Sequence, residues 1–195
     1  DKSMKKTEVT VQVYDSFEDI DKKLKDQGFK VTGTYYLNDW YFSKNKDVKK
    51  MPYDDLIGES FLLRQVILND GKNISKLCYK SKRLDKEGNV ISEQKTECNV
   101  DDLHNALKIF ENAKLNNWCC IKNKSISYSN GAMCFDLQII EDLGTFIEYE
   151  EDQSMKDLSA KAKFNLMQNN LQKLQLNFGK DFSCKKVFMK LHLTV

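Results

Sequence analysis

The chain has 195 residues, of which 41% are hydrophobic, and its 31 basic and 29 acidic residues leave a formal net charge of +2. This size and composition exclude a natively disordered chain and favour one domain, which we expect to span residues 4–195. The balanced charge excludes a global field that would recruit nucleic acid or an anionic membrane, so we expect charged residues to act locally.

Cysteines and histidines give no metal-site pattern. The chain has six cysteines without a C-x-x-C pair and only two histidines, so we expect reduced structural thiols rather than zinc ligands. No secretion signal is recognisable, and no apolar run approaches the ~18 residues of a membrane span. These features predict a cytoplasmic protein, and they leave a homodimer open.

The first half of the chain predicts strands and one helix. Residues 8–13 alternate between valine and polar side chains, which is typical of a half-buried strand. Ser16 can cap an amphipathic helix that ends near Gly28, and its apolar stripe should pack on the valine face. Strands are expected at 35–43 and 59–68, separated by a mobile loop around Pro52 that lies over an opening.

The second half predicts two hairpins and three helices. The hairpins are expected at residues 75–100, with a turn at 86–89, and at 118–140. A helix between them should begin at Asp101 or Asp102. After a strand at 143–152, a long helix should begin at Ser154, and a short helix is expected around residues 187–191. The strand core would then span about 8–150, and the C-terminal helices 154–195.

On several predicted strands, charged side chains occupy alternate positions and therefore share one face, often with apolar side chains on the other face. These residues are Glu8, Arg64, Lys80, Lys82, Lys95, Glu97, Lys122, Lys124, Asp136, Glu148 and Glu150. If the helices cover the apolar faces, the charged faces turn inward together, as in a closed antiparallel barrel with a polar bore. Carboxylates suit Mg²⁺ or Mn²⁺, and interleaved Lys and Arg suit phosphate oxygens. The pattern therefore indicates a site for a metal-bound polyphosphate.

Simpler interpretations stay open for each residue. Glu148 and Glu150 could lie on a solvated strand face. Arg64 lies in an apolar strand, where it needs either a phosphate ligand or a buried ion pair. The other lysines could individually be surface residues. We expect Lys76 and Lys82 to lie at the surface, although Lys82 could reach the mouth of the bore.

The order of short motifs resembles the CYTH, or triphosphate tunnel, superfamily, and most closely the class IV adenylate cyclases. The matching residues run from Glu8 through a D-x-Y-F strand, an L-R strand, a Y-K strand and an L-G-x-F-x-E-x-E strand. They are Glu8; Asp39, Tyr41 and Phe42; Leu63 and Arg64; Tyr79 and Lys80; Lys95 and Glu97; Lys122 and Lys124; Asp136; and Leu143, Gly144, Phe146, Glu148 and Glu150.

This resemblance implies an α+β fold with a closed eight-stranded antiparallel barrel and flanking helices. It implies phosphate binding by Arg64, Lys80, Lys95, Lys122 and Lys124, and binding of Mg²⁺ or Mn²⁺ by Glu8, Asp136, Glu148 and Glu150. Glu97 and Lys82 are additional candidates. It assigns no catalytic residue, since cyclases and triphosphatases both depend on charge neutralisation and in-line placement more than on a protein nucleophile.

The first strand departs from the family pattern. Where the family has E-x-E-x-K, this chain has Glu8, Thr10 and Gln12, so one carboxylate and one lysine are missing. Lysine also replaces arginine at Lys95 and Lys124, which keeps the charge but loses the bidentate fork.

Four functional hypotheses follow. The first is a cyclase-like protein that converts ATP to cyclic AMP and pyrophosphate with a divalent metal. The second is a hydrolase of inorganic tripolyphosphate or thiamine triphosphate. The third is a module that binds a nucleotide or polyphosphate without turnover, which the degraded first strand favours. The fourth is a structural protein whose charged faces meet solvent.

Overall fold

Eight antiparallel strands form a single sheet in an α+β fold. The computed structural model describes residues 6–58, 60–88 and 90–193. The strands are β1 (Glu8–Val13), β2 (Lys30–Ser43), β3 (Ser60–Leu68), β4 (Asn73–Leu84), β5 (Val90–Asn99), β6 (Asn116–Ser129), β7 (Cys134–Ile140) and β8 (Gly144–Glu150). Their order in the sheet is β1-β8-β7-β6-β2-β3-β4-β5. The eight antiparallel strands are confirmed, while residues 4, 5, 59, 89, 194 and 195 of the expected domain lie outside the described residues.

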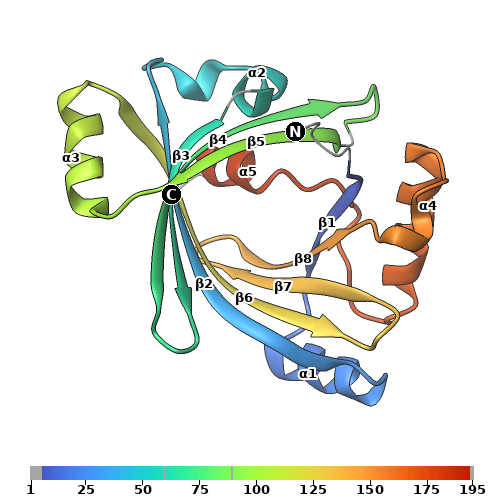
Figure 1. Ribbon diagram of the computed structural model, residues 1–195. Coiled ribbons are helices and arrows are strands. Elements are labelled where there is room, and N and C mark those ends of the chain that lie inside the picture. Colours follow the sequence, from blue (N-terminus) through green and yellow to red (C-terminus); the bar gives the residue numbers. More distant parts are fainter. Residues whose placement is uncertain (1–5, 59, 89, 194–195) are drawn as a thin grey trace.

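Within the described residues, five α-helices flank the sheet. They are α1 (Phe17–Asp26), α2 (Tyr53–Gly58), α3 (Leu103–Asn112), α4 (Ala160–Gln172) and α5 (Lys186–Leu191), and 3₁₀ turns occur at Val48–Lys50 and Gln153–Met155. The sheet curls between them as a half-barrel, with α1 and α4 outside the curve and α5 within it (Figure 1).

The expected closure of the sheet into a barrel is not confirmed. β1 and β5 are its two edges, and no ladder joins them within the described ranges. The free edge of β1 is instead covered by the C-terminal segment: the Thr10 amide donates to the Phe182 carbonyl, and the Cys184 amide donates to the Thr10 carbonyl. A backbone group that is already paired cannot join a ladder with β5, so this segment accounts for the open side.

The convex side of the β1 half of the sheet carries the larger core. The valines of β1 pack there with Ile20 and Leu24 of α1 and with Met167 and Leu171 of α4. Helix α1 begins as expected, since the Ser16 hydroxyl accepts a hydrogen bond from the Asp19 amide. It ends at Asp26, and Gly28 follows closely with a φ of +86°, which favours glycine.

The concave side has its own smaller core, which positions the C-terminal helix. Tyr41, Leu62 and Phe146 belong to it, and Val187 and Met189 of α5 pack against it. Helix α5 is therefore held inside the curve of the sheet by apolar contacts. This packing brings the basic start of the helix toward the charged strands.

Three expected elements differ in detail. β2 begins at Lys30, five residues before the strand expected at 35–43. The long helix begins at Ala160 and not after Ser154, because the Ser159 hydroxyl caps it, whereas the Ser154 amide and hydroxyl bind Asp152 in a 3₁₀ turn. The expected loop around Pro52 contains a 3₁₀ turn and the short helix α2. Tyr53, the first residue of α2, does line the opening.

Candidate functional site

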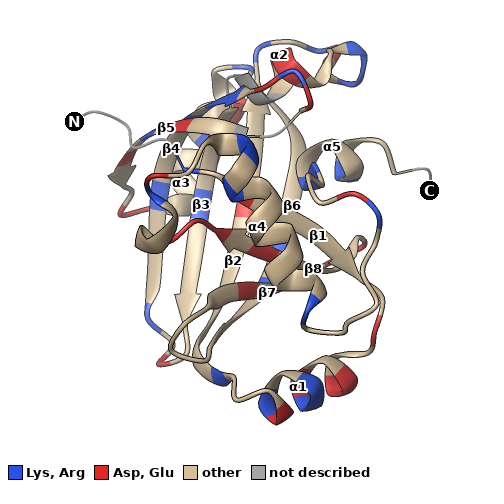
Figure 2. Ribbon diagram, turned by 90° about the vertical axis from the view of Figure 1, so that its right-hand side faces the viewer, with Lys and Arg blue, Asp and Glu red and all other residues tan. Residues whose placement is uncertain are grey.

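The concave face encloses a cavity of about 630 Å³. It contains eight of the eleven predicted site residues: Glu8, Arg64, Lys80, Lys82, Lys95, Glu97, Glu148 and Glu150. Acidic and basic residues both occur on the strands around it (Figure 2). Lys122, Lys124 and Asp136 do not line this cavity.

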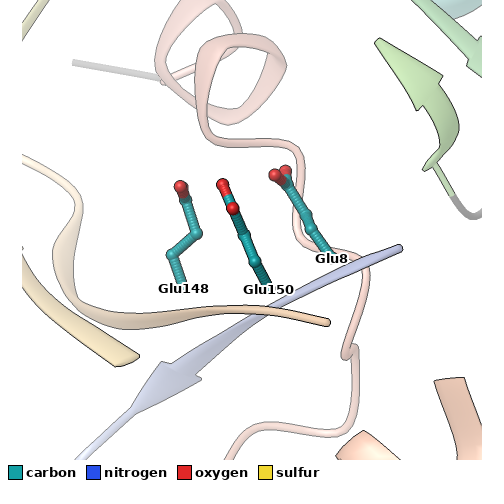
Figure 3. Close-up of side chains that lie close together, drawn as sticks. All are labelled: Glu8, Glu148 and Glu150. Atoms are coloured by element: carbon teal, nitrogen blue, oxygen red, sulfur yellow. The ribbon is translucent and has the colours of Figure 1, made fainter. Parts of the chain in front are cut away.

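Three carboxylates meet on the edge formed by β1 and β8. Glu8 and Glu150 are opposite each other in the ladder, and Glu148 lies two residues along β8, so all three side chains share one face. Each offers an oxygen within 4.8 Å of the others, and Figure 3 shows the three side chains side by side. We refer to Glu8, Glu148 and Glu150 as the carboxylate triad.

Each member of the triad forms an ion pair with a lysine from a different part of the chain. The three pairs are Lys82–Glu8 at 3.5 Å, Lys186–Glu148 at 2.6 Å and Lys6–Glu150 at 3.5 Å. Like charges this close repel one another, and the lysines offset the repulsion. The Lys82–Glu8 pair also links β4 to β1 across the open side of the sheet.

Two triad members have pKa values displaced in opposite directions. The nearby Lys186 ammonium lowers the pKa of Glu148 to about 2. Burial, together with the negative charge of Glu148, raises the pKa of Glu8. The two carboxylates lie on neighbouring strands, but their different surroundings move their pKa values apart.

The facing wall of the cavity, on β3, β4 and β5, is basic. Its cations are Arg64, Lys76, Lys80, Lys82 and Lys95. Burial lowers the pKa of Lys80, and the positive charge of Arg64 adds to this effect. Glu93 and Glu97 lie among these cations, and the Lys95 ammonium, which donates to Glu97, lowers the pKa of Glu97 to about 2. Lys76, expected at the surface, belongs to this wall.

Arg64 takes part in a buried bidentate ion pair. Its Nε and Nη2 atoms donate to the two carboxylate oxygens of Asp39 at 2.7 and 2.8 Å, and Asp39 is only 3% exposed. The sequence left either a phosphate ligand or a buried ion pair as the partner of Arg64, and the structure shows the ion pair. The guanidinium still lines the cavity, and its other donors can reach a ligand there.

Lys122 and Lys124 lie on the opposite face of the sheet. Ile121 and Asn123 line the cavity, and successive side chains of a strand alternate between faces. Lys122 is exposed, and the Lys124 ammonium lies 6.0 Å from the centre of the Tyr36 ring. The structure therefore separates these lysines from the other predicted phosphate ligands.

We expect the double substitution of Lys122 and Lys124 by alanine to leave tripolyphosphate affinity within about twofold of the parent protein. The reason is that neither ammonium faces the cavity, and isolated surface charges contribute little at physiological ionic strength. Calorimetric titration would measure this affinity. A tenfold loss would show that the two lysines reach the ligand after all.

Asp136 lies beside the triad but is not among the residues that line the cavity. It is opposite Glu148 in the β7–β8 ladder, and its carboxylate accepts hydrogen bonds from Ser127 at 2.6 Å and Tyr35 at 3.3 Å. Burial raises its pKa. These contacts place Asp136 as a neighbour of the triad rather than as its fourth member.

The replaced positions of the first strand have different surroundings. Thr10 lines the cavity and is only 4% exposed. The Gln12 amide donates to the Leu143 carbonyl at 3.2 Å, and Gln12 is not among the residues around the cavity. The missing family carboxylate therefore falls at the site, whereas Gln12 stabilises the turn before β8.

The main residue that the sequence analysis missed is Lys186, on α5. It contacts Glu148 and also donates to Gln138. The only sequence signal was a basic stretch before the short C-terminal helix, and nothing in that stretch indicates that it folds into the sheet. Glu93 of β5 and Tyr53 of α2 also line the cavity without having been predicted as site residues.

The triad fits a divalent cation of the Mg²⁺ or Mn²⁺ type. Three carboxylates with oxygens within 4.8 Å of one another are the hard ligands that these ions prefer. The basic wall across the cavity suits phosphate oxygens. The cavity therefore combines carboxylates of the kind that bind such ions with cations of the kind that bind phosphate.

The fold has relatives among solved structures, although no protein-family model and no curated protein matches the chain. The PH1012 protein of Pyrococcus horikoshii is 22% identical, with a TM-score of 0.67 over 95% of this chain and 98% of that one. A protein of Vibrio parahaemolyticus described as a "putative adenylate cyclase" is 15% identical, with a TM-score of 0.59 over 96% and 99%. A chain of the Schizosaccharomyces pombe Mediator head module is 12% identical, with a TM-score of 0.54 over 90% and 98%.

No helix within the described residues has the length and apolar character needed to cross a membrane.

The likenesses to solved structures concern the fold. The curled antiparallel sheet, its match to the Vibrio structure over nearly the full length of both chains and the ordered motifs on its strands agree with one another. The chain therefore shares its fold with a structure described as a putative adenylate cyclase, in agreement with the expectation drawn from its motifs.

Proposed function

We propose that the protein binds a nucleoside triphosphate with Mg²⁺ or Mn²⁺ in the concave cavity and converts ATP to cyclic AMP and pyrophosphate. The observation that carries this proposal is the pairing of a carboxylate triad with a basic wall in one cavity of about 630 Å³. That volume is within the usual range for small-molecule sites. The name of the Vibrio structure adds support for the choice of a cyclase.

In this proposal, Glu8, Glu148 and Glu150 hold the metal ion, which would supply charge neutralisation at the phosphates. Lys80, Lys82 and Lys95 bind phosphate oxygens as point charges. Arg64, fixed in orientation by Asp39, presents its remaining donors to the same chain of phosphates. These residues bind and orient the substrate, so no protein nucleophile is required.

The reaction forms one P–O bond and breaks another, and the ribose 3′ hydroxyl loses its proton. The 3′ oxygen attacks the α-phosphorus as its proton passes to water or to the leaving pyrophosphate, the bond from the α-phosphorus to its bridging oxygen breaks, and pyrophosphate leaves with that oxygen. Negative charge accumulates on the leaving pyrophosphate. In this proposal, the cations of the basic wall stabilise this charge. Such electrostatic stabilisation is usually the largest contribution to catalysis of phosphoryl transfer.

Incubation of the protein with ATP and Mn²⁺, followed by identification of the products, tests the proposal. Cyclic AMP and pyrophosphate in equal amounts would support the cyclase. Phosphate release from ATP, tripolyphosphate or thiamine triphosphate would instead identify a hydrolase that uses the same site. A matched Glu148→Gln variant should abolish either activity.

A non-catalytic binding module is the second candidate. It is favoured by Thr10, which stands at the cavity where the family has a carboxylate. The occurrence of this fold in the Mediator head module also indicates that the fold alone does not imply one chemistry. This candidate predicts that tripolyphosphate raises the melting temperature while no product forms from any triphosphate. Measurable turnover in the parent protein would contradict it.

A further inference from the structure

The floor of the cavity contains a neutral patch within its charged surroundings. Leu37 of β2 lies opposite Val66 of β3 on one side and opposite Asn123 of β6 on the other. All three residues line the cavity. We refer to Leu37, Val66 and Asn123 as the neutral patch.

Asn123 has unused hydrogen-bonding capacity. It is only 5% exposed, and its amide oxygen has no hydrogen-bond partner in the part of the chain that the structure describes. Leaving a buried polar atom unpaired is unfavourable, so such atoms normally have a partner. Rotation of the amide exchanges its oxygen and nitrogen, so the group can present either an acceptor or a donor to the cavity.

The neutral patch is one step along the strands from the basic wall. Asp39 lies two residues from Leu37 on the same face of β2, which is about 7 Å along the strand, and Asp39 is opposite Arg64 in the ladder. The row that contains Arg64 is thus followed directly by the row that contains Leu37 and Val66. A ligand with its phosphates on the basic wall would extend its next group over the neutral patch.

We infer that the neutral patch is a nucleobase subsite and that Asn123 is a residue that determines base specificity. Leu37 and Val66 offer apolar surface to a planar ring, which a charged wall would not. A side-chain amide can pair in a bidentate manner with the amino and ring nitrogens of adenine. This inference rests on the proposed triphosphate site and selects nucleotides over inorganic polyphosphates as its ligands.

Comparing 3′-deoxy-ATP with tripolyphosphate tests the inference, because the two share the phosphates and differ in the nucleoside. We expect 3′-deoxy-ATP to bind the parent protein at least about tenfold more tightly in calorimetric titrations with Mn²⁺. Asn123→Ala should weaken 3′-deoxy-ATP about tenfold and leave tripolyphosphate within about twofold. Asn38→Ala is the matched control, since Asn38 is on the other face of the sheet, where it donates to Gln65 at 3.1 Å.

The outcomes separate this inference from the proposed function. If tripolyphosphate binds the parent and 3′-deoxy-ATP binds no more tightly, the nucleobase subsite is wrong while the phosphate site stands. Equal weakening of both ligands by Asn123→Ala would also overturn it. If neither ligand binds the parent, the proposed function itself fails. The comparison within the parent protein decides the matter even where the variant does not fold.

Discussion

Replacing Arg64 by methionine is expected to lower the free energy of unfolding by roughly 3–5 kcal/mol. The substitution removes both donors from the Asp39 carboxylate, which is only 3% exposed. A buried carboxylate without its cation loses the charge-assisted hydrogen bonds that offset its desolvation. Urea unfolding at neutral pH, followed by circular dichroism, would measure the loss.

A double variant distinguishes two effects: the loss of the ion pair itself, and the cost of leaving the Asp39 carboxylate buried without a cation. Arg64→Met combined with Asp39→Leu replaces both partners with apolar groups, and such replacements are often close to neutral. We expect the double variant to recover most of the lost stability and yet to bind tripolyphosphate at least tenfold more weakly than the parent. A double variant as unstable as Arg64→Met alone would contradict this account of the ion pair.

Local signals explain why much of the fold was predictable. The alternation of residues 8–13 and the Ser16 cap each depend on residues close together in sequence. Such patterns specify a strand and a helix without knowledge of the rest of the chain. The start of α4 was harder to predict, because Ser154 and Ser159 are both good caps and only the structure shows that Ser154 is engaged by Asp152.

The alternation of side chains along the strands did not predict whether the sheet closes into a barrel. Whether β1 pairs with β5 depends on which segment reaches the edge of β1, and that segment is Asn177 to Cys184. These residues follow β1 by more than 160 positions in the chain, and no local pattern records the contact. Lys186 joins the site for the same reason, because apolar packing of α5 carries it there.

The sequence did not show to which side of the sheet Lys122 and Lys124 point, because β6 has buried apolar residues on both faces. Ile121 is buried on the cavity side, whereas Ile126 and Tyr128 are buried in the convex core. Odd and even positions therefore both include apolar residues, so the pattern does not identify an inner face. The register with β2 and β7 was needed to show that Asn123, between the two lysines, lines the cavity.

Replacing Lys186 by methionine is expected to destabilise the protein by about 2 kcal/mol at pH 7, since it removes the partner that lowers the pKa of Glu148 to about 2. A carboxylate whose folded pKa is depressed contributes stability above its unfolded value, near 4.5, and this contribution disappears as the pH falls toward 2. The difference between variant and parent should therefore be largest at neutral pH and shrink through this acidic window.

Urea unfolding at several pH values between 2 and 7 would measure this difference. Glu97 also has a pKa lowered to about 2, but it titrates in both proteins and cancels when they are compared. Lys190→Met is the matched control: this lysine is on the same helix and pairs at 2.9 Å with Asp142, whose side chain is 66% exposed. Because water screens that pair, its loss should cost little. A Lys186→Met effect that stays constant across the whole pH range would mean that the lysine stabilises α5 by packing, and not by neutralising the triad.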